Sequence, residues 1–225
     1  MVTRTVPDVP NDVLRSMYDG RTTLGAIGPV LAEGLYRTVR REAPRSVVEV
    51  GMACGASTIA ILTALEANGG EGQLISVDPF QHQNWHGQGV ENVVKARLAH
   101  RHRLVEEFDY LALGDLLRQG LEVDFAYIDG RHNFDYTLLD FFFLDKMLRV
   151  GGLVGFNDCH YRAVEKVASF VMSHRRYEEE DIGLPPRRIV RAQWHRLIGR
   201  WVNPNDRYFR KRESWEPDPK YYAAF

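Results

Sequence analysis

The sequence predicts an α/β protein built on a mostly parallel, doubly wound β-sheet with helices on both faces. Short runs rich in β-branched residues alternate with longer segments of helical periodicity, which is the pattern of successive βα units. The chain has 225 residues, 44% of them apolar, and this is enough for the core of one such domain. No internal repeat or low-complexity stretch interrupts the alternation. We therefore expect a single domain over residues 1–225.

The first predicted elements lie before residue 70. Apolar residues recur at helical spacing ahead of Pro44, where a helix has to end, and these are Ile27, Val30, Leu31, Leu35 and Val39. The run SVVEVG is the first strand. Ser57 opens the next helix, through STIAILTALEA, and Asn68 with the glycines at 69 and 70 terminates it because these residues tolerate left-handed backbone angles.

Four further βα units follow, up to about residue 174. An aromatic and histidine-rich loop, FQHQNWHGQG, connects the second strand to its helix. In order, the elements are the strand LISVDPF, a helix near residues 89–100, the strand HRLVEE, the short helix LGDLLRQ, the strand VDFAYIDG, the helix YTLLDFFFLDKML ended by Gly151 and Gly152, the strand GGLVGFNDC, and the helix AVEKVASFVMSH.

The composition changes after residue 174. Residues 175–212 contain eleven Lys or Arg against five Asp or Glu, interspersed with aromatic side chains. No nucleic-acid-binding module is recognisable there, so a solvated face covering the sheet edge is favoured over a nucleic-acid surface. Dimer contacts, and with them a homodimer, stay open. One or two antiparallel strands in this segment complete a sheet of about seven strands.

Charge and composition favour small-molecule chemistry. With 29 basic and 30 acidic residues the net charge is -1, which predicts no general attraction to nucleic acid or to an anionic membrane. The amino-terminal MVTRTVPDVPND has no apolar stretch of signal-peptide length, and Asp140 and Asp145 break the most apolar run, so we expect a soluble cytoplasmic protein. Cys54 and Cys159 follow strands expected to lie two places apart, beyond disulfide reach, and are interpreted as free thiols.

Polar residues gather at the carboxyl ends of the predicted strands, which is where open parallel sheets bind ligands. The residues at these five strand ends are Glu49 with Gly51, Asp78, Glu106 with Glu107, Asp129, and Asn157 with Asp158. A scatter of solvated surface charges would not select five strand ends. We therefore expect one shared cleft.

The turn after the first strand is compatible with an anionic ligand. Gly51 and Gly55 allow a tight turn and close approach of the backbone, and the helix that follows presents free amides with Ser57 at its start. The spacing is G-x-x-x-G and differs from the G-x-G-x-x-G of dinucleotide-binding proteins, so a nicotinamide enzyme is disfavoured. Asp78, about one βα unit downstream, is suited to accept two hydrogen bonds from the paired hydroxyls of a ribose.

The chain resembles class I S-adenosylmethionine-dependent methyltransferases over roughly residues 25–170. Within that class it is most similar to the metal-dependent small-molecule O-methyltransferases, such as catechol O-methyltransferase and certain macrolide-sugar methyltransferases. The motifs that carry the resemblance are VVEVGMACGAST, SVDPF, YIDGRHNFDY and GGLVGFNDC. It implies a Rossmann-like, seven-stranded fold with a helical cap (1–43), a cofactor-binding core (44–172) and a basic, aromatic edge segment (173–225).

The resemblance also implies roles for individual residues in binding S-adenosylmethionine. Glu49 would face the amino group of the methionine part, Ser57 its carboxylate and Asp78 the ribose. Residues after the third strand, Glu107 among them, would lie near the adenine, although this chain has EEFD where many relatives carry a glycine-acid-serine turn. The expected cofactor contacts are completed by Gly51, Gly55 and Asp129.

A metal site is predicted beside the cofactor. Asp129, Asn157 and Asp158 come from adjacent strand ends and supply hard oxygen ligands, which suit magnesium. The alternative for Asp129 is a carboxylate that caps the IDG turn. His132 lies at the position that carries the general base in the related enzymes, where it would deprotonate a metal-bound hydroxyl. Its alternative is a loop histidine that contacts only cofactor or solvent.

These observations predict an S-adenosylmethionine-dependent, magnesium-dependent O-methyltransferase that acts on a hydroxyl of a small molecule such as a sugar or natural product. Trp85, His82 and His86 either line its pocket or belong to an ordinary surface loop. One alternative keeps the cofactor but transfers the methyl group to nitrogen or carbon without a metal. Another is a non-catalytic cofactor-binding or assembly protein.

Overall fold

The computed structural model describes residues 6–19, 24–185, 187–193, 196–202 and 205–225. Its centre is a seven-stranded sheet in the order β3-β2-β1-β4-β5-β9-β6, in which β1 to β5 are parallel and β9 is antiparallel to both of its neighbours. The strands are β1 (Ser46–Val50), β2 (Gln73–Val77), β3 (His102–Val105), β4 (Val123–Ile128), β5 (Leu148–Phe156), β6 (Tyr177–Glu180) and β9 (Arg207–Lys211). The predicted fold class is confirmed.

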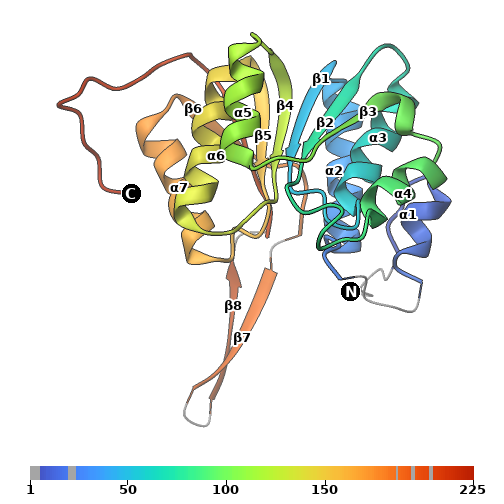
Figure 1. The fold of residues 1–225 in the computed structure, drawn as a ribbon. Helices are drawn as coiled ribbons and strands as arrows, with labels where there is room; N and C mark the ends of the chain where they lie inside the picture. Colours follow the sequence, from blue (N-terminus) through green and yellow to red (C-terminus); the bar gives the residue numbers. More distant parts are fainter. Residues whose placement is uncertain (1–5, 20–23, 186, 194–195, 203–204) are drawn as a thin grey trace.

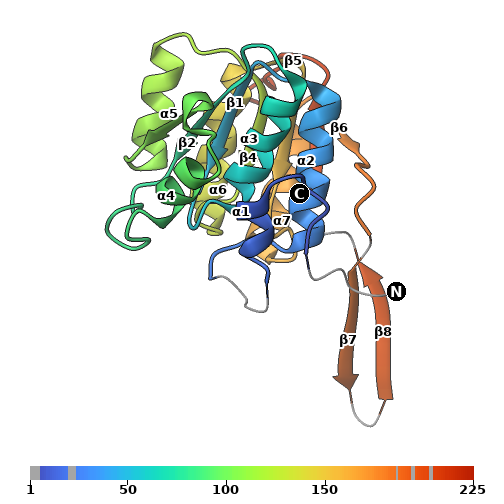
Figure 2. The ribbon, with the colours of Figure 1, turned by 90° about the vertical axis from the view of Figure 1, so that its right-hand side faces the viewer.

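Helices cover both faces of the sheet, as Figures 1 and 2 show. One layer holds α1 to α4 and the other holds α5 to α7, and a separate apolar core fills the space on each side. The helices are α1 (Asp12–Ser16), α2 (Pro29–Glu42), α3 (Ala56–Asn68), α4 (Gln88–Lys95), α5 (Asp109–Arg118), α6 (Phe134–Met147) and α7 (Arg162–His174), with a 3₁₀ turn, η1 (Ala99–Arg101), before β3.

The strand order places a crevice beside β1. This strand pairs with β2 on one side and with β4 on the other, so the direction of winding reverses there. Ligands of open α/β sheets bind beyond the carboxyl ends of the strands at such a point. Strand β1 is almost wholly buried, and α3, which follows it, is buried over its first ten residues because α2 packs on its outer side.

Two predicted helix limits are wrong, and backbone geometry explains both. The helix expected to end at Gly151 and Gly152 stops at Met147, and the two glycines lie inside β5, where the pairing with β4 is irregular and Gly151 has a φ of 84°. The helix expected near 89–100 ends at Lys95, since Arg97 adopts a left-handed φ of 61° before the 3₁₀ turn.

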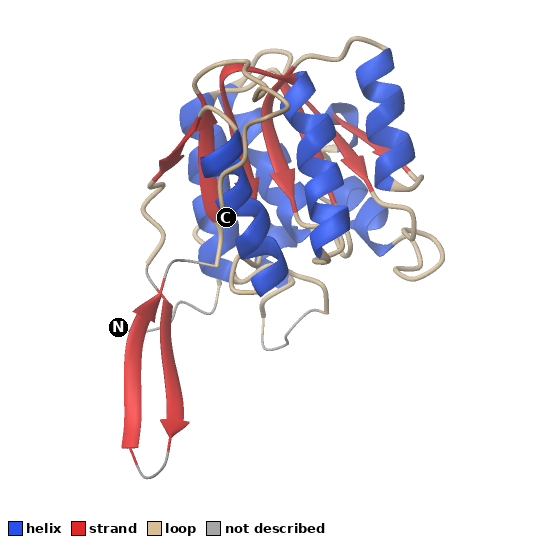
Figure 3. Cartoon of the chain, turned by 90° about the vertical axis from the view of Figure 1, so that its left-hand side faces the viewer, coloured by secondary structure: helices blue, strands red, loops and turns tan. Residues whose placement is uncertain are grey.

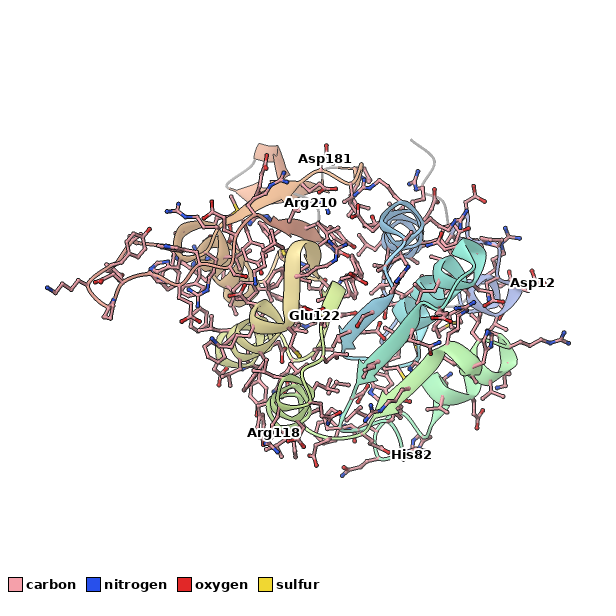
Figure 4. All side chains as sticks on the ribbon, turned by 90° about the horizontal axis from the view of Figure 1, so that it is seen from above. Asp12, His82, Arg118, Glu122, Asp181 and Arg210 are labelled. Carbon is pink, nitrogen blue, oxygen red and sulfur yellow. The ribbon has the colours of Figure 1, made fainter. Side chains whose placement is uncertain are left out.

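The basic carboxyl-terminal segment supplies the last two strands at one side of the sheet. Strand β9 lies between β5 and β6, and Arg210 of β9 bonds to Glu42 of α2 and to Glu180 of β6. Arg212 likewise pairs with Glu178. Figure 4 shows Arg210 at this end of the sheet, with His82 at the other. The segment thus belongs to the sheet itself, and Tyr208 and Phe209 of β9 are buried in the core, which differs from the expected solvated face over the sheet edge.

The carboxyl-terminal segment contains more strands than the one or two predicted, because it includes a two-stranded hairpin in addition to β6 and β9. The hairpin consists of β7 (Arg187–Gln193) and β8 (Arg196–Val202) and joins β6 to β9. Since β6 runs in the direction of β5, the hairpin leaves the sheet at the edge where the parallel strands end, and it projects away from the body of the protein (Figure 3).

Cys54 and Cys159 are both buried and free, as expected. None of the helices in the described part of the chain has the length and apolar character needed to span a bilayer.

Candidate active site

A cavity of about 410 Å³ opens at the carboxyl ends of β1, β2 and β4. Its volume falls in the range of small-molecule sites, and its wall combines an apolar surface with a few polar groups, as such sites do. The lining residues are Val50, Gly51, Asp78, Pro79, Phe80, Asn84, Trp85, Phe108, Asp109, Asp129, Gly130, Arg131 and Tyr136.

The glycine turn brings the β1 and β4 loops into contact. Gly51 has a φ of 88°, and a Cβ atom at this position would lie 2.1 Å from the backbone oxygen of Asp129. Gly55 has a φ of 87° and packs against Gly89 at the start of α4. The positive φ favours glycine at both positions, and at Gly51 there is in addition no room for a side chain. Ser57 follows in the first turn of α3, where it is 3% exposed and does not line the cavity.

Asp78 lines the cavity and also holds its wall together. One carboxylate oxygen accepts hydrogen bonds from the backbone N–H groups of Met52 and Ala53, at 3.1 and 2.8 Å, and the other accepts from the N–H of Phe80 at 2.9 Å. Gln81 donates to the same carboxylate from its side-chain amide. The acid that the sequence predicts for a ribose thus also fixes the glycine turn after β1.

Glu49 is sealed beneath the cavity with 0% exposure. Its Oε2 accepts hydrogen bonds from the hydroxyls of Thr58 and Ser76, both at 2.7 Å, whereas Oε1 receives none from the described residues. Burial raises the pKa of Glu49 to about 7. The carboxyl group is therefore a buried acid with one free acceptor, and a cation or donor near Oε1 would favour its charged form.

A second cavity, of about 300 Å³, adjoins the first and shares Trp85, Asp129 and Gly130 with it. One wall is polar and the other is apolar. The polar residues are Asp129, His132, Asn157, Asp158 and Asn205, and the apolar wall is formed by Gly25, Ala26, Ile27, Gly28, Leu31, Ala53 and Trp85.

His132 lies between two carboxylates in this second cavity. Its Nε2 is 3.4 Å from Oδ1 of Asp129 and 3.8 Å from Oδ2 of Asp158. Burial lowers the pKa of His132, but the two carboxylates outweigh burial and raise the pKa above its ordinary value. Burial raises the pKa of Asp129 to about 6, although His132 opposes the shift. The three side chains are therefore coupled electrostatically, although Nε2 of His132 has no hydrogen-bond partner among the described residues.

Asn157 is oriented from behind by a buried hydrogen-bond network. Its Nδ2 donates to Asp206 at 2.9 Å, and Tyr127 donates to the other oxygen of that carboxylate at 2.7 Å. Since the amide nitrogen is committed to Asp206, the amide oxygen is the atom left for a ligand in the cavity.

The oxygen atoms of Asp129, Asn157 and Asp158 line one cavity, and their chemistry fits a hard cation such as magnesium. In the described residues no group of three or more His, Cys, Asp or Glu side chains is arranged to hold a metal ion. The predicted trio contains an amide, and His132 stands between its two carboxylates.

Other predicted site residues lie apart from the cavities. Glu107 is exposed and accepts a hydrogen bond from the N–H of Phe108, while Glu106 pairs with His82 at the surface. His82 and His86 line neither of the two cavities, whereas Trp85 lines both, and Phe80 and Asn84 of the same loop line the first.

Sequence reasoning missed several lining residues. Asp109 lines the first cavity and Asn205 the second, and the segment 25–28 forms part of the apolar wall of the second. Asp109 is only two positions beyond Glu107, the residue that was predicted. The correct choice required knowing that α5 begins at Asp109. Asn205 follows the hairpin and carried no local signal.

This chain is similar to one protein family and to a set of solved structures. Residues 48–159 match the model of a family described as a methyltransferase domain. No curated protein sequence shows a significant match. Many solved structures are similar over most of the chain, and at their low sequence identity this similarity concerns the fold.

An O-methyltransferase from Bacillus cereus in complex with SAH has a TM-score of 0.65 and 14% identity, covering 89% of this chain and 89% of that one. The O-methyltransferase TomG from Streptomyces achromogenes, involved in tomaymycin synthesis and solved with SAM, has a TM-score of 0.64 and 15% identity, covering 90% and 88%. The SAH-bound methyltransferase PaMTH1 from Podospora anserina has a TM-score of 0.68 and 14% identity, covering 92% and 91%.

Proposed function

We propose that this chain, which carries a class I S-adenosylmethionine-dependent methyltransferase domain, transfers the methyl group to a hydroxyl of a small molecule. The observation that carries the proposal is the pair of adjoining cavities. One is lined by three of the residues expected at the cofactor, Gly51, Asp78 and Asp129, and the other contains His132 between two acids. Two of the similar structures are O-methyltransferases, which favours oxygen as the acceptor atom.

The first cavity is the proposed site of S-adenosylmethionine. Glu49, through its free Oε1, would accept a hydrogen bond from the ammonium group of the methionine part, and Ser57 at the start of α3 would hold the carboxylate. Asp78 would accept from the ribose hydroxyls. Phe108 and Asp109 line this cavity, whereas Glu107 does not. We therefore assign the adenine to the part of the cavity that Phe108 and Asp109 form.

The second cavity is the proposed acceptor site, and His132 is its base. Methyl transfer is an in-line displacement in which a lone pair of the acceptor oxygen attacks the sulfonium methyl carbon and the C–S bond breaks. The hydroxyl proton passes to Nε2 of His132, where the carboxylates of Asp129 and Asp158 stabilise the resulting imidazolium. The apolar wall that includes Trp85 would hold the carbon skeleton of the acceptor.

Magnesium is part of the proposal. Asp129, Asn157 and Asp158 would hold it, and a bound magnesium ion lowers the pKa of a hydroxyl that coordinates it. The position of His132 between the two carboxylates favours a second candidate, metal-independent methyl transfer, because the imidazolium supplies positive charge at the same place.

The test is formation of S-adenosylhomocysteine (SAH) from S-adenosylmethionine in the presence of a library of phenols, sugars and other hydroxyl compounds. The expected result is turnover with at least one hydroxyl acceptor, and loss of turnover after chelation that magnesium restores. Turnover that survives chelation would support the metal-independent candidate. Cofactor binding without turnover on any acceptor would contradict the enzymatic proposal for this site.

A further inference from the structure

A hydrogen-bonded chain crosses three strands of the sheet and ends at Glu49. The Nε2 atom of His102 on β3 lies 3.0 Å from Oγ of Ser76 on β2, and this hydroxyl bonds to Oε2 of Glu49 on β1 at 2.7 Å. Glu49 and Ser76 are directly paired in the register of β1 and β2, so the chain follows the sheet laterally. Both residues have 0% exposure.

The direction of each hydrogen bond follows from counting protons. A serine hydroxyl has one proton, and Ser76 donates it to the Glu49 carboxylate, which is an acceptor when ionised. The Ser76 oxygen must then accept from His102, so His102 carries its proton on Nε2. Burial lowers the pKa of His102 to about 4, and the neutral ring that results remains a single, fixed donor at neutral pH.

This chain decides which oxygen of Glu49 is available. Ser76 and Thr58 both donate to Oε2, so Oε1 is left as the only acceptor of the carboxylate without a partner among the described residues. If His102 did not donate to Ser76, the hydroxyl of Ser76 would be free to rotate, and Glu49 would lose one of the hydrogen bonds that favour its charged form.

We infer that His102 is a positioning residue for the cofactor, which acts through Ser76 to fix Glu49 as the acceptor of the ligand's ammonium group. This inference rests on the proposed role of Glu49. His102 lies on the third strand and is absent from both cavities, so its effect must be specific to the α-amino group of the ligand. A residue that merely supports the fold would affect all ligands of the cavity alike.

The test uses two ligands, SAH and an analogue of SAH that lacks only the α-amino group. Calorimetry of His102→Leu, which removes the donor, should show SAH affinity reduced about tenfold, the effect of losing one hydrogen bond to a charged group, and analogue affinity within twofold of wild type. His102→Gln, whose amide can donate to Ser76, should recover most of the loss. His100→Leu, at an exposed histidine two positions away, is the matched control.

Equal weakening of both ligands by His102→Leu, or no weakening of either, would overturn the inference and leave the role of Glu49 intact. If the wild-type protein binds SAH and the analogue equally well, the proposed role of Glu49 is itself wrong. A measurement on the wild-type protein needs no variant to fold: the ¹⁵N shifts of His102 should report the neutral tautomer protonated at Nε2. A charged ring, or a proton on Nδ1, would refute the relay.

Discussion

Replacing Glu49 with glutamine should stabilise the ligand-free protein at alkaline pH while weakening the cofactor. Burial raises the pKa of this carboxyl group from 4.5 to about 7. In the unfolded chain the group loses its proton above pH 4.5, but in the folded protein it keeps the proton until about pH 7. Glu49 therefore contributes stability that is fully present below pH 4.5 and is lost as the pH rises to 7.

The magnitude follows from the difference between the two pKa values. Each pKa unit corresponds to about 1.4 kcal/mol, so the wild-type protein should lose roughly 2 to 3 kcal/mol between pH 5 and pH 8 through this residue. Glutamine has no proton to lose at this position. The free energy of unfolding of Glu49→Gln, measured relative to wild type, should rise by that amount over the same pH range.

The assay is urea unfolding of both proteins at pH 5, 6, 7 and 8, in which all other titrating groups cancel between the two chains. Glu122→Gln, at an exposed glutamate, is the matched control and should show no such trend. Calorimetry with SAH at pH 8 should show that Glu49→Gln binds roughly 10- to 100-fold more weakly, because the ammonium group loses a charged acceptor. A stability difference that stays constant with pH would refute the reasoning about burial, and unchanged SAH affinity would refute the ammonium contact.

Three further outcomes are expected. His132→Ala should retain SAH affinity by calorimetry while turnover falls by about 10² or more, and a parallel loss of both would make the residue structural. Asp78→Ala should weaken SAH binding and also lower the melting temperature, since the backbone N–H groups of Met52, Ala53 and Phe80 lose their acceptor. Unchanged affinity would remove Asp78 from the ribose. Gly51→Ala should destabilise the fold by more than ~2 kcal/mol in urea unfolding, because its Cβ would overlap the Asp129 carbonyl, and near-normal stability would contradict that close approach.

The sequence was sufficient for the parallel part of the fold because its signals are local. A buried parallel strand is a largely apolar run, and β1, β2, β4 and β5 appear in the sequence as such runs followed by helical periodicity, whereas β3 (HRLV) is short and only half apolar. Strand β9 could not be placed in this way, since its partners, β5 and β6, are determined by contacts that are distant in sequence. The hairpin of β7 and β8 depends likewise on pairings that composition does not reveal.

The site residues show the same distinction between local signals and contacts that are distant in sequence. The acids at the strand ends were visible because a charge next to a buried strand is unusual, and Asp78 and Asp129 do line a cavity. The partners of Glu49 were not visible, because Thr58 and Ser76 come from α3 and β2 and meet the carboxylate only through the sheet register. Glu107 was chosen in place of Asp109 because the start of α5 is not marked by a side-chain cap.

Trp85 belongs to the walls of both cavities, and Gly25 leaves its indole no spare room, since a Cβ there would lie 2.5 Å from the ring. Donor and acceptor would thus contact the same indole ring, and a shift of this ring away from one substrate would move it toward the other. Thermodynamic linkage then requires that the bound donor changes the affinity for the acceptor by the same factor as the bound acceptor changes the affinity for the donor. Binding of the two substrates should accordingly be antagonistic, and double-reciprocal initial-rate plots should intersect below the abscissa.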